Sequence, residues 1–185
     1  MHSLTLPILV TWTLLGASAW AVREDLLAHR IPNRLTGSLL CAGFALQFAF
    51  SGWSGLAQAA LGGVVGLAML LPFYLLRAMG AGDVKLLAAM GTLLGPQWAL
   101  VAGIYTLIAG GVLAMCYLLA GALRAAAQPA TASWPLRMHF ALERAQQLRR
   151  ERFPYALAIV VGAFASLAQR GDLQTALRYM SGGAA

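Results

Sequence analysis

Long stretches without a charged residue restrict the folds available to this 185-residue chain. The longest runs from Leu86 to Leu123, 38 residues without Asp, Glu, Lys or Arg. About 20 apolar residues in a helix already cross the hydrocarbon core of a membrane. Unbroken apolar runs of this kind are typical of helices and not of the alternating strands of a membrane β-barrel. The sequence therefore predicts an all-α, polytopic membrane helical bundle.

The apolar runs divide into six predicted transmembrane segments. Gly52 to Gly55 separates the second from the third, which we expect to form an antiparallel pair, and Gly95-Pro96 divides the longest run. The fourth segment is short, because its 13 residues span only about 20 Å as a helix. The predicted segments are Leu4–Val22, Leu35–Ser51, Leu56–Leu76, Asp83–Gly95, Gln97–Leu123 and Phe153–Gln169. We expect them to form one membrane-embedded domain over residues 1–185.

The positive charge of the chain is explained by membrane topology. The chain carries 13 Lys and Arg residues against 6 Asp and Glu residues, a net charge of +7. If successive loops alternate between the two sides, 11 of the 13 basic residues fall on one side, which the positive-inside rule identifies as the cytoplasm. The N-terminus and the C-terminal tail then face outward. We expect membrane lipids as partners and no nucleic acid, and an amphipathic basic helix in the cytoplasmic loop at about 124–152.

Two of the six acidic residues are not explained by ion pairing or by their position at a surface. Four of them are expected to be ordinary solvated, headgroup-level or helix-capping charges. These four are Glu24, Glu143, Glu151 and Asp172. Asp25, which follows the first segment, and Asp83, which opens the fourth, come to the same membrane face in the predicted topology.

Asp25 and Asp83 together could perform general acid–base chemistry. Two carboxyl groups at one site of low dielectric constant tend to share a proton, so that one acts as a base toward water while the other donates a hydrogen bond to a peptide carbonyl. We expect Gly80 and Gly82 to permit a close-packed, otherwise strained backbone before Asp83. The alternative is structural, with Asp83 as a helix cap and Asp25 as a juxtamembrane charge.

Three segments resemble, in order and spacing, the signature stretches of the type IV prepilin peptidases, membrane aspartyl proteases of the GxGD class. They are DLLAHRIPN at 25–33, GAGDVKLLAAMG at 80–91 and PYALAIVVG at 154–162. Within that family the chain is most similar to the short enzymes of the tight-adherence (Flp) pilus systems. The resemblance implies an aspartyl endopeptidase of the bacterial inner membrane that removes the N-terminal leader of Flp-type prepilins or pseudopilins at the cytoplasmic face.

The resemblance also implies roles for individual residues. Asp25 and Asp83 would be the catalytic pair, with no metal ion and no cofactor. Residues implied to shape the loops or orient the substrate are Gly80, Gly82, Lys85, Arg30 and Asn33. Lys85 could equally be a positive-inside charge, and Arg30 and Asn33 could be solvated. We expect the last span, headed by Pro154-Tyr155, only to pack against the site.

The chain departs from the larger members of the family in its cysteines. Those members bind zinc through two CxxC pairs and also methylate the new N-terminus. Here the two cysteines, Cys41 and Cys116, lie 75 positions apart inside apolar runs, where we expect them to be buried. The sequence therefore predicts cleavage without methylation.

Two other classes of function stay open at the level of sequence. A small transporter or ion relay would use Asp25, Asp83 and Lys85 to carry ions or protons. A non-catalytic pilus assembly factor would need no acid–base pair. The glycines of the apolar runs permit close helix packing, which we expect mainly within the chain, with a homo-oligomer as the alternative.

Overall fold

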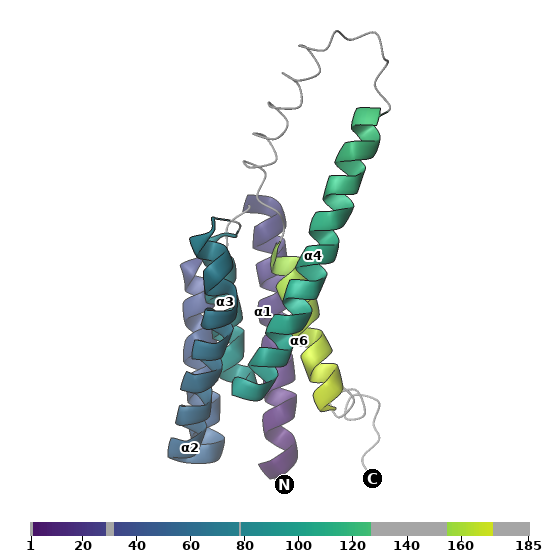
Figure 1. Cartoon of the computed structure of the whole chain (residues 1–185). Helices are drawn as coiled ribbons and strands as arrows, with labels where there is room; N and C mark the ends of the chain where they lie inside the picture. The colour runs from purple at the N-terminus through teal and green to yellow at the C-terminus, as the bar shows by residue number, and fades with distance from the viewer. Residues whose placement is uncertain (1, 29–31, 78, 127–154, 172–185) are drawn as a thin grey trace. The chain divides into compact units, whose positions relative to one another are not determined.

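Residues 2–28, 32–77, 79–126 and 155–171 are described by a computed structural model, and nearly all of them are helical (Figure 1). These ranges contain no β-strand, so the prediction of an all-α protein is confirmed. In chain order the helices are α1 (His2–Ala28), α2 (Asn33–Leu75), α3 (Ala81–Leu94), α4 (Pro96–Ala126) and α6 (Tyr155–Arg170). Each of the six predicted segments corresponds to one helical stretch, because α2 contains two of them.

The chain divides into two compact units, one of residues 1–110 with 154–185 and the other of residues 111–153. The first unit contains α1, α2, α3, α6 and the first half of α4, and it holds both Asp25 and Asp83. The amphipathic helix predicted at about 124–152 lies outside the described residues from 127 onward. A single domain over residues 1–185 stays a prediction.

Helix α2 turns back on itself at Gly52, whose φ of 59° and ψ of −140° are not helical and are readily adopted only by glycine. Its contacts with α3 reveal the reversal. Along α2, the neighbouring pairs are Asn33 with Lys85, Gly43 with Thr92, Gly62 with Gly91 and Gly66 with Leu87. The residue number of the α3 partner thus rises along α2 before Gly52 and falls after it. The two arms of α2 are therefore antiparallel, as the sequence predicts.

Helix α3 packs against both arms of α2 and also touches α1 and α6. Every residue from Leu86 to Leu94 is buried, which explains why the sequence of this helix shows no polar face. The close approach depends on glycine. A Cβ on Gly62 would overlap the carbonyl oxygen of Gly91, and a Cβ on Gly91 would overlap that of Gly62.

Side chains from other helices hydrogen-bond the last carbonyl groups of α3. With 14 residues the helix is about 21 Å long, so it is as short as the sequence predicts. Gln47 Nε2 donates to the Leu93 carbonyl at 3.0 Å, and Arg170 Nη1 donates to the Leu94 carbonyl at 3.4 Å. A buried carbonyl without such a partner costs about 1–3 kcal/mol. These two bonds therefore let α3 end inside the bundle.

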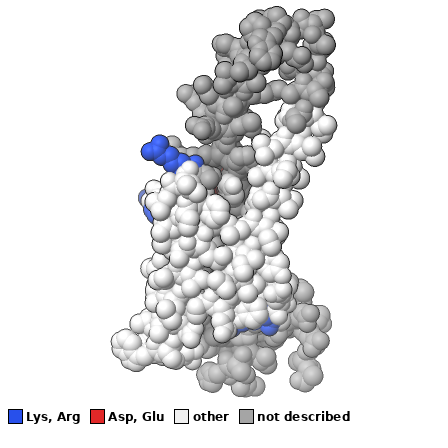
Figure 2. Space-filling view, in the orientation of Figure 1, with Lys and Arg blue, Asp and Glu red and all other residues white. Residues whose placement is uncertain are grey.

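The outer surfaces of α2 and α4 are apolar, as expected for contact with lipid. Within the described ranges these two helices are long and apolar enough to cross a membrane. Figure 2 shows basic side chains at two ends of the visible face and an uncharged belt between them. Large exposed apolar residues include Leu61, Val64, Leu67, Leu100, Ile104 and Ile108. That all six predicted segments cross a membrane stays a prediction.

Cys41 and Cys116 are exposed on α2 and α4, so the prediction that they are buried is wrong. A small apolar side chain tolerates either environment in a membrane protein, because lipid is as apolar as the protein interior. Apolar neighbours in the sequence therefore do not distinguish the two environments.

Gly62→Ala is expected to destabilise the packing of α2 on α3 by about 1–3 kcal/mol, because the new methyl group overlaps the Gly91 backbone. Gly37→Ala is the matched control, since Gly37 lies on the same helix and a Cβ there meets nothing within 4 Å. That control should be neutral or slightly stabilising. Thermal unfolding of the detergent-solubilised protein measures both variants. Equal unfolding temperatures would contradict this packing.

Candidate active site

Helix ends from several parts of the chain lie at one end of the first unit, among them the C-terminal end of α1 and the N-terminal ends of α2, α3 and α6 (Figure 1). Helix α1 packs against α2, α3 and α6, and α3 packs against α6. Segments that lie far apart in the sequence, including the two that carry Asp25 and Asp83, are thereby brought to the same end of the unit.

Asp25 lies in the last turn of α1 and is buried, with 6% of its surface exposed. The apolar face of α1 determines this position. Leu14 and Ala21 are fully buried, and Asp25 lies one turn beyond Ala21 on the same face. The helix continues to Ala28, past the predicted end of the first span at Val22. Asp25 is therefore held by a helix and not by a loop.

Asp83 is the third residue of α3 and is buried, with 9% of its surface exposed. The N–H of Gly80 donates to Asp83 Oδ2 at 3.3 Å, and the N–H of Asp83 donates to the Gly80 carbonyl at 3.2 Å. This reciprocal pair closes the first turn of α3 and fixes the carboxylate relative to the helix axis. The helix begins at Ala81, two residues before the position that the sequence predicts.

Neither Gly80 nor Gly82 has a left-handed backbone, so the prediction of a strained glycine loop is wrong. Gly80 is extended, with φ of −79° and ψ of 150°, and Gly82 lies within the first turn of α3. A Cβ on Gly80 would lie 3.3 Å from Asp83 Oδ2. The absence of a side chain at Gly80 thus leaves room beside the carboxylate. Among the described residues between α2 and α3, Arg77 has a left-handed backbone, with φ of 57°.

A hydrogen bond joins the two segments that carry the aspartates. Lys85 Nζ donates to Asn33 Oδ1 at 3.2 Å, and both side chains are exposed. Lys85 follows Asp83 by two residues, and Asn33 ends the stretch 25–33 that Asp25 begins and is the first residue of α2. The structure therefore brings these two sequence-predicted residues together. Arg30 lies outside the described residues.

For Tyr155 the sequence predicts only that it packs the last span against the site. It begins α6 and is half-buried, and its ring packs against Gly110, where a Cβ would lie 3.0 Å from Tyr155 Cε1. A tyrosine at the polar end of an apolar run is usually an interfacial anchor, so only the packing of α6 on α3 shows that Tyr155 lies at the same end of the unit as Asp83.

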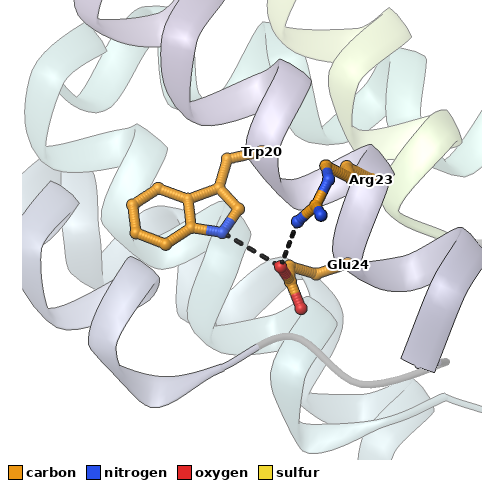
Figure 3. Close-up of polar contacts among 3 residues, drawn as sticks. All are labelled: Trp20, Arg23 and Glu24. Atoms are coloured by element: carbon orange, nitrogen blue, oxygen red, sulfur yellow. Dashed lines mark hydrogen bonds and ion pairs between the residues drawn. The ribbon is translucent and has the colours of Figure 1, made fainter.

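Glu24 is the other acid at this end of the described chain, and its contacts lie on its own helix. Its Oε1 accepts hydrogen bonds from Arg23 Nη1 at 3.0 Å and from Trp20 Nε1 at 3.3 Å (Figure 3). The sequence predicts Glu24 as a charge at headgroup level, which stays a prediction, and the structure pairs it with Arg23. The described residues contain no group of three or more His, Cys, Asp and Glu side chains arranged to hold a metal ion.

The model of the type IV leader peptidase family matches residues 5–118, which include Asp25, Asp83 and all of α3. The chain belongs to the type IV leader peptidase family. Members of this family are membrane-embedded aspartic peptidases that act on prepilins, so the protein is an enzyme and its substrate is a prepilin. No curated protein and no solved structure gives a significant match.

Asn33→Ala and Lys85→Met are each expected to lower the rate of leader cleavage about two- to tenfold, because both remove the same hydrogen bond. The double variant should be no slower than the slower single variant. A cleavage assay on all three variants measures this coupling, with Arg34→Ala as the control for loss of a neighbouring exposed charge. Losses that multiply in the double variant would show that the two side chains act independently.

Proposed function

We propose that this leader peptidase hydrolyses its substrate with Asp25 and Asp83 as a catalytic pair. The observation that carries the proposal is that two buried carboxyl groups lie at one end of the first unit, on helices that pack against each other. Burial of two carboxyl groups near one another disfavours ionisation of both. Such a pair keeps one proton at neutral pH, which is the state that hydrolysis by an aspartic peptidase needs.

The chemistry requires one carboxylate and one carboxylic acid. The carboxylate takes a proton from a water molecule, whose oxygen then attacks the carbon of the scissile peptide group. The carboxylic acid gives its proton to the carbonyl oxygen, and a neutral tetrahedral intermediate forms. Transfer of a proton to the amide nitrogen then lets the C–N bond break. The pair returns to its starting state, so neither a metal ion nor a cofactor is needed.

The site faces the cytoplasm in this proposal, and the N-terminus faces outward. The exposed basic residues at the end that holds the aspartates support this orientation under the positive-inside rule. They are Arg23, Arg34, Arg77 and Lys85. Arg170 bonds the opposite end of α3, which faces the outer side of the membrane in this proposal. A prepilin with its apolar helix in the bacterial inner membrane would then present its leader junction at the depth of Asp25 and Asp83.

The substrate is proposed to be a prepilin of the Flp type, which is cleaved without subsequent methylation. The resemblance of its signature segments to those of the tight-adherence enzymes supports this assignment. The CxxC pairs of the bifunctional relatives have no counterpart in the sequence, whose cysteines are Cys41 and Cys116. Membership of a peptidase family favours this reading over a transporter or an assembly factor.

Asp25→Asn and Asp83→Asn are each expected to lower leader cleavage at least about 10³-fold, because the pair acts as one unit. Glu24→Gln is the matched control, since it removes a neighbouring carboxylate whose partners are Arg23 and Trp20. Co-expression with a Flp-type prepilin, followed by mass spectrometry of the pilin N-terminus, measures cleavage and methylation together. Normal leader removal by either aspartate variant would refute the catalytic pair.

A further inference from the structure

Helix α3 and the first arm of α2 begin near one level of the membrane and end at different levels. Asn33, the first residue of α2, accepts a hydrogen bond from Lys85, near the start of α3. From Asn33 to its turn at Gly52 the arm is about 28 Å long, close to the thickness of about 30 Å of a hydrocarbon core. Helix α3 is only about 21 Å long. Its junction with α4 at Gly95 therefore lies short of the turn of α2, as Figure 1 shows.

Contacts between α2 and α3 give the depth of this junction below the turn of α2. On the first arm, Gln47 donates to the Leu93 carbonyl, and it lies five residues before Gly52. On the second arm, Gln58 lies six residues after Gly52, and its Oε1 would be 3.8 Å from a Cβ on Gly95. At about 1.5 Å per residue, both arms place the junction about 8 to 9 Å inward of the turn.

Polar side chains from three helices gather at the junction. Arg170 Nη1 donates to the Leu94 carbonyl at 3.4 Å, which brings the C-terminal end of α6 to this place. The junction cluster consists of Gln47 and Gln58 of α2, Gln97 of α4, and Gln169 and Arg170 of α6. Gln58, Gln97 and Gln169 are exposed. The surface of the unit is therefore polar where α3 ends.

On the far side of α2, the exposed residues at the same depth are apolar. Gly43 and Gln47 both contact α3. Ala45 lies midway between them in the sequence, so it is on the opposite side of the helix, and it is exposed. Cys41, one turn away on that side, is exposed as well. Lipid chains therefore fit this side of α2 at the depth where α3 ends.

Aromatic residues lie at the turn of α2. Trp53 is 79% exposed, and its ring packs edge-on against that of Phe48, with centroids 5.8 Å apart. Tryptophan is enriched where the hydrocarbon core meets the headgroups. The turn therefore fits the headgroup level of the surrounding membrane, and the junction, about 8 to 9 Å further inward, falls at the depth of lipid chains.

The exposed glutamines of the junction cluster do not fit lipid chains. An amide group in hydrocarbon loses its hydrogen bonds to water, which is costly. A bilayer thins around an apolar segment that is shorter than its hydrocarbon core, as α3 is. Thinning beside α3 would bring headgroup oxygens to the side chains of Gln58 and Gln97, whose N–H groups can donate to them.

We propose that the lipid headgroups of the leaflet opposite the aspartates reach inward to the junction cluster and hydrogen-bond Gln58 and Gln97. That leaflet is then about 8 to 9 Å thinner beside α3 than beside the first arm of α2. In the proposed orientation it is the outer leaflet. Both ends of the short α3 then lie at a polar surface, with Asp83 at the inner one. The inference concerns lipid contacts and does not depend on the catalytic pair.

Quenching of a fluorophore by nitroxide-labelled lipids measures which part of the lipid contacts a given residue. The test uses the full-length protein in lipid nanodiscs, with Cys41→Ala, Cys116→Ala and one introduced cysteine that carries the fluorophore. Gln58→Cys reports on the junction cluster. Ala45→Cys is the matched control, since Ala45 lies seven residues before Gly52 and Gln58 six residues after it.

We expect a nitroxide on the headgroup to quench the label at position 58 more strongly than a nitroxide at the middle of the acyl chain does. The reverse order is expected at position 45. Stronger chain quenching at both positions would overturn the proposal, because the bilayer is then not thinned. Stronger headgroup quenching at both would overturn it too, because the bilayer is then thin on every side. So would a label at position 58 that neither lipid quenches, because water or protein then covers the cluster.

Labels on α4 provide a second test that leaves Gln58 in place. Gln97→Cys reports on the same level, and Ile104→Cys is its control, since Ile104 is exposed and lies seven residues further along α4. We expect stronger headgroup quenching at position 97 and stronger chain quenching at position 104. The same order of quenching at the two positions would overturn the proposal. No cleavage assay enters these measurements, so their outcome is separate from that of the aspartate variants.

Discussion

The packing of α3 against the folded-back helix α2 is the contact on which the rest of the first unit depends. Glycines on both helices allow their backbones to approach closely. At Gly62 and Gly91, the backbone of each residue lies so near the carbonyl oxygen of the other that neither has room for a Cβ. In lipid there is little hydrophobic driving force between helices, so close van der Waals contact has to hold them together. Because α3 packs against α2 along its length, the carboxyl group of Asp83 at the start of α3 occupies a defined position.

The short length of α3 has consequences at both of its ends. At the C-terminal end, Gln47 and Arg170 reach in from α2 and α6 to bond the last carbonyl groups. At the N-terminal end, Gly80 and Asp83 bond each other and close the first turn. Polar groups inside a membrane protein need partners, because no water is available to them. The chain meets this requirement with few polar side chains and places the carboxyl group of Asp83 at one of these ends.

Much of the fold could be predicted from the sequence, because a membrane imposes a simple rule of length and polarity on each helix. The reversal at Gly52, the short α3 and the candidate pair Asp25 and Asp83 follow from uncharged runs and from the scarcity of acids. Other features depend on contacts between helices, and the sequence contains no comparable pattern that predicts them. The hydrogen bond from Arg170 to the Leu94 carbonyl joins residues 76 positions apart, and a sequence of apolar residues does not tell lipid from protein around Cys41 and Cys116. The glycines before Asp83 suggested strain, whereas in the structure Gly80 leaves room beside a carboxylate.

In the proposed mechanism, Asp25 and Asp83 act together on one water molecule. The distance between their nearest carboxyl oxygens, in an experimental structure of the enzyme with a prepilin segment bound in a lipid membrane, tests this mechanism. We predict roughly 3–6 Å, which allows a single water molecule to bridge the two groups beside the scissile peptide bond. A substrate-bound structure in which the two carboxyl groups lie too far apart for one water, or in which another side chain contacts the scissile bond in place of either, would contradict the account.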